Sequence, residues 1–237
     1  MGAAAFATTH WSLVLTAQED SPAAEEALET LCRAYWKPLY AFVRREGLSR
    51  EDARDLTQGF FALILERRDL DNVRKEKGRF RSYLLTALKH FLTDEWRRTM
   101  TIKRGQGRKP ISLEEIELEE QIEREAHDRI TPELIYERQW ASTLLGGVLG
   151  QLKDEYRAAG NLEIFEALKE LLPGEPGTPS QAEIAKQFGM TANAVRQAFH
   201  RFRHRYQLLL REEIAHTVAN PGEVEDELRH LISVIRT

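Results

Sequence analysis

Apolar residues recur at intervals of three and four along almost the whole chain, which is the period of an α-helix buried on one face. No stretch of the sequence shows the strict alternation of apolar and polar residues that marks a half-buried strand. The pattern therefore predicts an all-α fold. The segments that carry it are residues 23–46, 49–67, 79–98, 132–156, 161–172, 180–188, 191–210 and 221–235.

Length and composition allow two small domains and exclude several classes of protein. With 237 residues the chain is long enough to bury two hydrophobic cores. Its one cysteine, Cys32, rules out an intramolecular disulfide and fits a reducing compartment. No apolar run approaches the roughly 18 residues of a membrane-spanning helix, so we expect a cytoplasmic protein without a membrane partner.

The helical segments fall into two groups separated by a charged stretch. Residues 10–98 form the first predicted domain and residues 132–211 the second. Between them, residues 99–131 hold a basic run with glycine and proline, followed by an acidic run, and we expect a flexible charged linker. Residues 212–237 are predicted to add a C-terminal helical extension.

Residues 180–206 read SQAEIAKQFGMTANAVRQAFHRFRHRY and have the pattern of a helix-turn-helix. Ser180 and Glu183 have the spacing of a capping box that opens a short first helix. Gly189 supplies the positive φ angle that a tight turn needs. Thr191 can cap the second helix, which is rich in arginine and nearly free of acids.

Charge is unevenly distributed, although the net charge is only −4. Residues 74–109 contain 12 Lys and Arg against 3 Asp and Glu, and residues 180–211 contain 6 against 1. Residues 112–128 contain 1 Arg against 8 acids. Two basic blocks that flank an acidic one indicate two separate contacts with a polyanion. The helix-turn-helix makes DNA the expected ligand.

Three stretches of the chain carry a resemblance to a known family. They are YWKPLYAFVRREGLSREDARDLTQGFFALIL at residues 35–65, GRFRSYLLTALKHFLTDEWRR at residues 78–98, and residues 144–210. They look like regions 2.1–2.2, 2.3–2.4 and 4 of the extracytoplasmic-function (group 4) sigma-70 factors. The resemblance implies a sigma factor, which binds bacterial core RNA polymerase and directs promoter-specific transcription initiation.

The resemblance implies contacts with two parts of the polymerase, the clamp helices of the β′ subunit and the β flap. In the first domain, acidic and amide side chains around an apolar one would bind the β′ clamp helices. The implied β′-binding residues are Asp52, Asp55, Gln58 and Phe60. The helical period also places Phe60 on the inner face of its helix, with Leu56, Leu63 and Ile64.

The resemblance also implies that the first domain binds the −10 promoter element. Its cations would hold the phosphates of the melting duplex, and Phe80, Tyr83 or Trp96 would stack on an unpaired base. The helical period alone would put such aromatic rings in the core. The implied −10 residues are Arg74, Lys75, Lys77, Arg79, Phe80, Arg81, Tyr83, Lys89, Arg97 and Arg98.

The second domain is expected to bind the −35 element through the helix that follows the turn. Asn193, Arg196 and Gln197 lie in its first two turns and carry donors for base edges in the major groove. The remaining polar side chains would contact phosphates, which fix the register without reading the sequence. These are Thr191, His200, Arg201, Arg203 and Arg205.

Arg54 is one of the departures from the family pattern. These factors commonly carry an acid where this chain has Arg54, and Thr57 follows three residues later. We hypothesise that a Ser/Thr kinase phosphorylates Thr57 and restores negative charge to the polymerase-binding surface. A threonine without that role is the alternative, and an anti-sigma factor is a second regulator that the resemblance allows.

Two other classes of protein remain open. A stand-alone helix-turn-helix regulator would bind duplex DNA without polymerase, and would not need the DARDLTQGFF surface. A helical nucleic-acid hydrolase would need acids or histidines at metal-ligand spacing. The sequence holds no phosphate-binding loop, zinc motif or nucleophile elbow, so we expect no catalytic residue, cofactor or metal.

Overall fold

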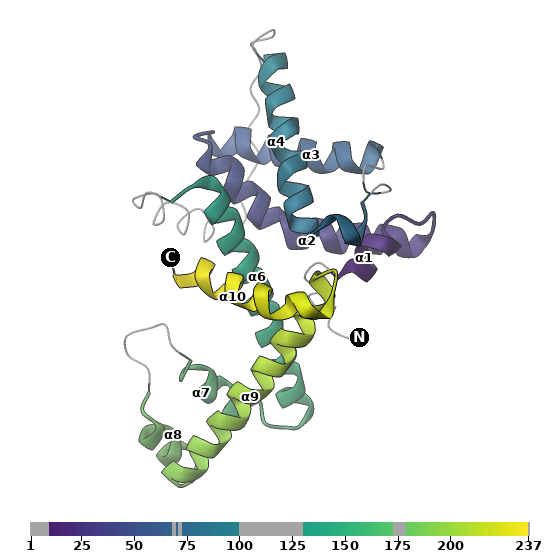
Figure 1. Ribbon diagram of the computed structural model, residues 1–237. Coiled ribbons are helices and arrows are strands. Elements are labelled where there is room, and N and C mark those ends of the chain that lie inside the picture. Colours follow the sequence, from purple (N-terminus) through teal and green to yellow (C-terminus); the bar gives the residue numbers. More distant parts are fainter. Residues whose placement is uncertain (1–9, 68–69, 71–72, 100–129, 173–178, 237) are drawn as a thin grey trace. The chain divides into compact units, whose positions relative to one another are not determined.

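The computed structural model describes residues 10–67, 70, 73–99, 130–172 and 179–236, and every regular element within these ranges is a helix (Figure 1). The predicted all-α class is confirmed for this part of the chain. The expected linker at residues 99–131 falls almost entirely outside the described residues. The α-helices are α1 (Trp11–Thr16), α2 (Pro22–Arg45), α3 (Arg50–Arg67), α4 (Phe80–Thr99), α6 (Pro132–Ala158), α7 (Leu162–Lys169), α8 (Gln181–Gln187), α9 (Ala192–Thr217) and α10 (Val224–Arg236), with 3₁₀ turns at Lys75–Lys77 and Pro221–Glu223.

Short polar side chains start the helices where the sequence predicts. Ser49 Oγ accepts a hydrogen bond from the Asp52 amide at 3.1 Å and caps α3. Thr131 Oγ1 accepts one from the Leu134 amide at 3.2 Å at the start of α6. Each bond satisfies an amide that the first turn of a helix leaves without a backbone partner. Helix α1 was not predicted from the sequence.

The chain divides into two compact units, and the division differs from the predicted domains. The larger unit comprises Ala7–Leu144 together with Ile214–Thr237, and the smaller unit comprises Leu145–Glu213. The boundary therefore falls inside α6 and α9 and not at residues 131 and 212. The reason is burial, because Tyr136 and Trp140 of α6 and Leu231 of α10 belong to the core of the larger unit.

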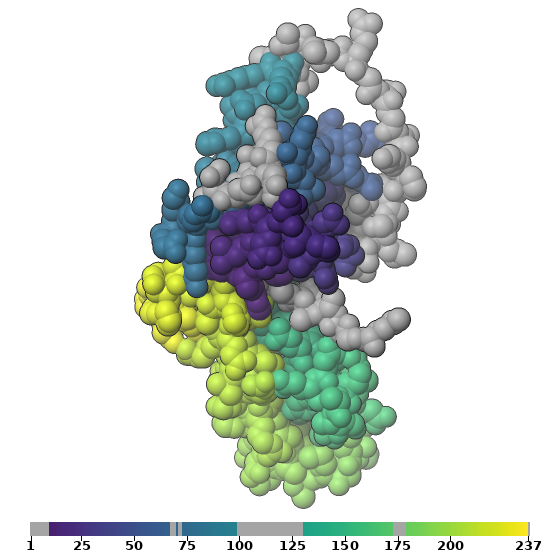
Figure 2. Space-filling model, turned by 90° about the vertical axis from the view of Figure 1, so that its right-hand side faces the viewer, coloured from purple at the N-terminus to yellow at the C-terminus, as the bar shows by residue number. Residues whose placement is uncertain are grey.

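The core of the larger unit is built from aromatic rings on α1, α2, α3 and α4. Phe80 meets Trp11 and Tyr35 edge-on, with ring centroids 6.3 and 5.6 Å apart. Phe60 packs against Phe91 with centroids 5.8 Å apart. Figure 2 shows α1 and the beginning of α2, in purple, packed together on one face of this unit. The contacts of Phe80 fix the start of α4, where Phe80 stands between Arg79 and Arg81.

The core of the smaller unit holds the helix-turn-helix in place. Tyr156 of α6, Phe165 of α7 and Phe202 of α9 form a cluster with ring centroids 5.6 to 5.8 Å apart. Ile184 of α8 and Val195 of α9 are buried beside the turn. The inner face of α9 is thus committed to packing, which directs its other face to solvent.

Candidate nucleic-acid interface

The turn between α8 and α9 has the predicted geometry. Ser180 Oγ accepts from the Glu183 amide at 3.2 Å, and the Glu183 carboxylate accepts from the Ser180 amide at 2.6 Å. This backbone hydrogen bond lowers the pKa of Glu183. Gly189 follows with a φ of 61°, and Thr191 Oγ1 accepts from the Ala194 amide at 3.1 Å. The capping box, the turn glycine and the second cap are all confirmed.

The outer face of α9 presents nitrogen donors to solvent. Its inner face, with Val195, Ala198 and Phe202, is buried. The exposed polar residues are Asn193, Arg196, Gln197, His200, Arg201, Arg203 and His204. All of the predicted base-reading residues are therefore accessible, and so are four of the five predicted phosphate contacts, since Thr191 is exposed as well.

A shallow hollow on this face is lined by side chains that nucleic acid can use. Its wall includes Gln181 at the start of α8 together with Arg196, His200 and Arg203 of α9. The Arg203 guanidinium lies over the half-buried ring of Phe199, 5.8 Å from its centroid. The amide and guanidinium groups can donate hydrogen bonds to base edges, and the aromatic ring offers an apolar contact.

Arg205 differs from its neighbours because an internal partner holds it. Its Nε and Nη2 bind both carboxylate oxygens of Glu155 on α6, at 2.9 and 2.5 Å. The hydrogen bond from this pair raises the pKa of Arg205. The pair joins α9 to α6 within the smaller unit, but its two side chains are 40% and 42% exposed. An exposed ion pair of this kind is weak, so the phosphate contact of Arg205 stays a prediction.

The predicted polymerase-binding surface on α3 is only partly exposed. Asp52, Asp55 and Gln58 face solvent. Phe60 is 1% exposed and packs against Phe61 and Phe91, so its role as an accessible apolar contact is wrong. The helical period predicted that Phe60 lies on the inner face of its helix, and its burial confirms that prediction.

Thr57 does not present its hydroxyl for modification. The residue is 0% exposed, and its Oγ1 donates to the Ala53 carbonyl at 2.7 Å. A kinase needs the hydroxyl to be free at the surface, and a phosphate at this buried position would carry about two negative charges into the core. The folded larger unit therefore contradicts the hypothesis of a phosphorylation site at Thr57.

The basic residues of the predicted −10 surface fall into an outer group and an inner group. The outer group is Arg74, Lys75, Lys77, Lys89, Arg97 and Arg98, all exposed or half-exposed. Within it, Lys89 binds Glu133 at 2.6 Å and Arg98 binds Glu95 at 2.8 Å. Exposed ion pairs of this kind are worth about 0 to 1 kcal/mol. Phosphates can replace such partners at little cost.

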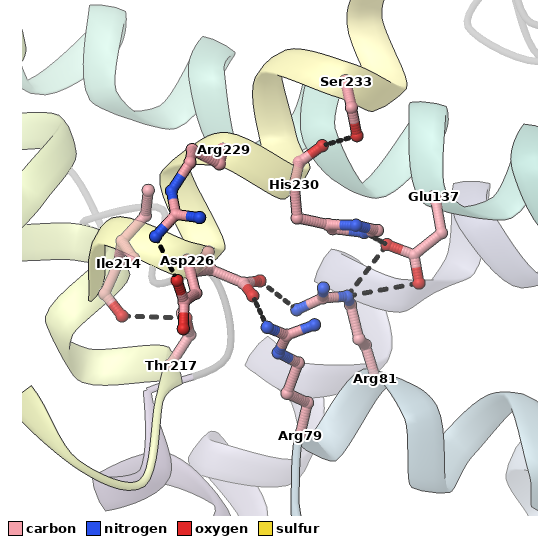
Figure 3. A network of polar contacts seen from close by, with 10 residues as sticks. Arg79, Arg81, Glu137, Ile214, Thr217, Asp226, Arg229, His230 and Ser233 are labelled. Atoms are coloured by element: carbon pink, nitrogen blue, oxygen red, sulfur yellow. Dashed lines mark hydrogen bonds and ion pairs between the residues drawn. The ribbon is translucent and has the colours of Figure 1, made fainter. Parts of the chain in front are cut away.

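The inner group, Arg79 and Arg81, is held in a network of charged side chains (Figure 3). Arg79 binds one carboxylate oxygen of Glu227 at 2.5 Å, and Arg81 donates to the other. Arg81 also donates its Nε to Glu137 at 2.9 Å. Its guanidinium carbon lies 4.0 Å from the ring centroid of Trp140. The network joins α4, α6 and α10 of the larger unit.

Burial makes Arg81 a structural residue. Its side chain is 3% exposed, and the partner Glu227 is 0% exposed. Burial acts to lower the pKa of Arg81, but the charges of Glu137 and Glu227 outweigh it and raise that pKa. Burial acts to raise the pKa of Glu137, and the hydrogen bond from His230 at 3.0 Å with the charge of Arg81 lowers it overall. The predicted −10 contact of Arg81 is therefore wrong in this fold.

Of the three predicted stacking residues, the structure contradicts Phe80. Phe80 is 2% exposed and lies in the core between Trp11 and Tyr35. Tyr83 is half-exposed and stacks on Phe80 with centroids 6.1 Å apart. Trp96 is 60% exposed and is thus the most accessible of the three candidate rings.

A groove between α2 and α4 lies beside Trp96. It has a volume of about 550 Å³ and is lined by Phe42, Leu48, Leu92 and Trp96, with Lys89 and Arg97 among its polar residues. An exposed indole next to two cations is a combination that binds an unpaired base and its phosphate. The sequence interpretation missed this groove, because Phe42 and Leu48 come from a different helix and loop.

No family profile, curated protein or solved structure matches this chain. None of the helices in the described part of the chain combines the length and apolar character that a membrane span requires. In the same ranges, no three His, Cys, Asp or Glu side chains gather as metal ligands would.

Proposed function

We propose that this protein is an extracytoplasmic-function-type sigma factor, which binds core RNA polymerase and directs promoter-specific transcription initiation. The observation that carries the proposal is the helix-turn-helix of the smaller unit. Its inner face is buried, and Asn193, Arg196 and Gln197 extend from the exposed first turns of α9. That position suits a helix that enters the major groove at a −35 element.

The larger unit supports the proposal with two surfaces of opposite charge. Asp52, Asp55 and Gln58 give α3 an exposed acidic and amide face, which suits basic residues of a polymerase subunit. The outer basic group, with Trp96, gives α4 and the preceding turn a surface that suits a partly melted −10 element. A factor that joins polymerase to promoter DNA needs both kinds of surface.

A stand-alone DNA-binding regulator is the second candidate, and one observation favours it. Arg79 and Arg81 are paired with Glu227, and Phe80 is buried. These three residues of the expected −10 surface are therefore unavailable in this structure. If the larger unit never binds DNA, the α8–α9 pair would act alone on duplex promoters.

Copurification with polymerase distinguishes the two candidates. The full chain is mixed with bacterial core RNA polymerase, passed through gel filtration, and the complex is used to transcribe a promoter library. A sigma factor co-elutes and gives transcripts with defined start sites, whose upstream sequences reveal the −10 and −35 elements. A chain that elutes separately and footprints duplex DNA alone would refute the sigma-factor proposal.

Matched charge variants test whether α3 is the polymerase-binding surface. The Asp52→Asn/Asp55→Asn double variant should weaken co-elution at least tenfold, because it removes the two exposed acids of α3 that are expected to bind the β′ subunit. The Glu25→Gln/Glu26→Gln double variant removes the same charge from the exposed face of α2 and should bind normally. Equal loss in both variants would show that only net charge matters.

A further inference from the structure

The buried Glu227 contacts two arginines that the sequence analysis assigned to nucleic-acid binding. It comes from α10, 146 residues after Arg81, and its two carboxylate oxygens bind different arginines. Arg79 and Arg81 lie close together at the start of α4 (Figure 3), and each contacts Glu227. Guanidinium groups bind carboxylates and phosphates with the same planar donor geometry. Glu227 therefore supplies the two guanidiniums with negative charge as a phosphate would, through a hydrogen bond from Arg81 and an ion pair with Arg79.

The acids around Glu227 add to this effect. Glu225, Asp226 and Glu227 form the first turn of α10, and Glu225 and Asp226 are exposed. Their charge repels a nucleic-acid backbone from the neighbouring Arg79, which is one-third exposed. While α10 is in place, this end of α4 is both occupied and shielded.

We propose that the start of α4 is a phosphate-binding site for nucleic acid and that α10 is its internal competitor. Release of Glu227 frees Arg79 to bind a backbone phosphate, while Arg81 keeps its second partner, Glu137. The inference rests on the proposed function for the identity of the ligand as promoter DNA. It goes beyond that function by assigning an autoinhibitory role to the C-terminal helix.

The size and place of α10 make its release feasible. The helix has 13 residues and follows α9 through the short turn Pro221–Glu223. Isolated helices of this length are marginal in water, so α10 depends on its packing, which buries Leu231 and Val234. A ligand that competes for the arginines removes the polar part of that packing.

Binding of a fluorescein-labelled single-stranded DNA of 20 nucleotides tests the site. Glu227→Gln should bind about fivefold more tightly than the wild-type chain at 0.1 M salt, the gain expected from one added phosphate contact. The slope of log K against log salt should steepen by about 0.7. Asp226→Asn makes the same charge change on the adjacent, exposed residue and should shift affinity less than twofold.

Two further measurements keep the test decisive. The Glu227→Gln/Arg79→Gln variant should lose the whole gain, because Arg79 makes the new contact. In the wild-type chain, saturating DNA should speed hydrogen exchange of the α10 amides at residues 224–236, a readout that does not require Glu227→Gln to fold. Equal affinity of Glu227→Gln and Asp226→Asn, or unchanged exchange in α10 with DNA bound, would overturn the proposal.

The outcomes also separate this inference from the proposed function. If the chain co-elutes with polymerase but Glu227→Gln shows no gain in DNA affinity, the proposed function is supported and the role of α10 as a competitor is refuted. If Glu227→Gln gains DNA affinity through Arg79 but the chain does not bind polymerase, the role of α10 is supported and the sigma-factor proposal is refuted. Intrinsic tryptophan emission checks the fold of each variant, because all four tryptophans lie in the larger unit.

Discussion

Replacing Glu227 by glutamine should destabilise the larger unit strongly. The carboxylate is 0% exposed, and its partners Arg81 and Arg79 are 3% and 33% exposed. Removing one partner of a buried ion pair costs about 3 to 5 kcal/mol, because the remaining charge stays buried without compensation. Arg81 keeps Glu137 and Arg79 reaches water, so we expect the lower end, about 3 kcal/mol.

The matched comparison is Glu133→Gln. Glu133 forms a geometrically similar pair with Lys89, at 2.6 Å, but the two side chains are 48% and 44% exposed. Exposed pairs are worth about 0 to 1 kcal/mol. The same chemical change should therefore cost at least three times less at this position, and the difference isolates the effect of burial.

Urea unfolding followed by tryptophan emission measures both variants in the larger unit alone, since Trp11, Trp36, Trp96 and Trp140 all belong to it. With a slope of about 2 kcal/mol per M, a loss of 3 kcal/mol lowers the midpoint by about 1.5 M. Glu133→Gln should lower it by less than about 0.5 M. Equal shifts in the two variants would refute the argument that the buried network holds α10 in the larger unit.

Four further predictions follow from the two units. The pKa of Glu137 is lower in the folded chain than its unfolded value of about 4.3, so ionised Glu137 stabilises the fold above that pH. This stabilisation is lost as the pH falls through the folded pKa. Glu137→Gln should therefore show a smaller drop in the urea midpoint between pH 7 and pH 4 than the wild-type chain. Phe202→Ala should lower the free energy of unfolding of the smaller unit by about 3 to 5 kcal/mol. Circular dichroism should show this loss, while the unfolding of the larger unit, followed by tryptophan emission, should be unchanged. Ser180→Ala removes a helix cap and should cost about 1 kcal/mol in the same circular dichroism transition. Arg196→Ala should cost about 1 to 3 kcal/mol of discrimination at one −35 base pair, measured as polymerase-dependent transcription from single-base promoter variants.

Elements with local signals could be predicted from the sequence. The capping box of Ser180 and Glu183, the glycine turn at Gly189 and the cap at Thr191 each depend on residues within four positions of one another. Such interactions are specified by the segment itself. For the same reason, the starts of α3 and α6 agree with the prediction.

The boundary between the two units could not be predicted from local signals in the sequence. The apolar period of residues 132–156 runs without a break through α6, although the two halves of that helix belong to different units. A helical period shows that a face is buried but not which element covers it. The partner is decided by tertiary packing, and for α10 that packing reaches back to Arg81 on α4.

The helical period of the sequence places two members of the buried network, Glu227 and Arg81, on the apolar faces of their helices. Glu227 lies at i, i+4 and i+7 with Leu231 and Val234, on the apolar stripe of α10. Arg81 lies three and seven residues before Leu84 and Leu88, which are buried on the inner face of α4. A charge on an apolar stripe is buried only with a partner. Because Glu227 and Arg81 have opposite charges and both lie on apolar stripes, the sequence pattern predicts that they pair.

Charge counted along a sequence therefore differs from charge available to a ligand. Residues 74–109 hold 12 Lys and Arg against 3 Asp and Glu, which suggests a uniformly basic surface. In the fold, Arg81 is neutralised inside the protein and Arg79 shares its partner Glu227, an acid that the local count leaves out. If the larger unit binds DNA as proposed, the polyanion reaches the outer cations directly and the inner pair only by displacing α10. The affinity of the larger unit for DNA would then be set by a competition within the chain as much as by its basic residues.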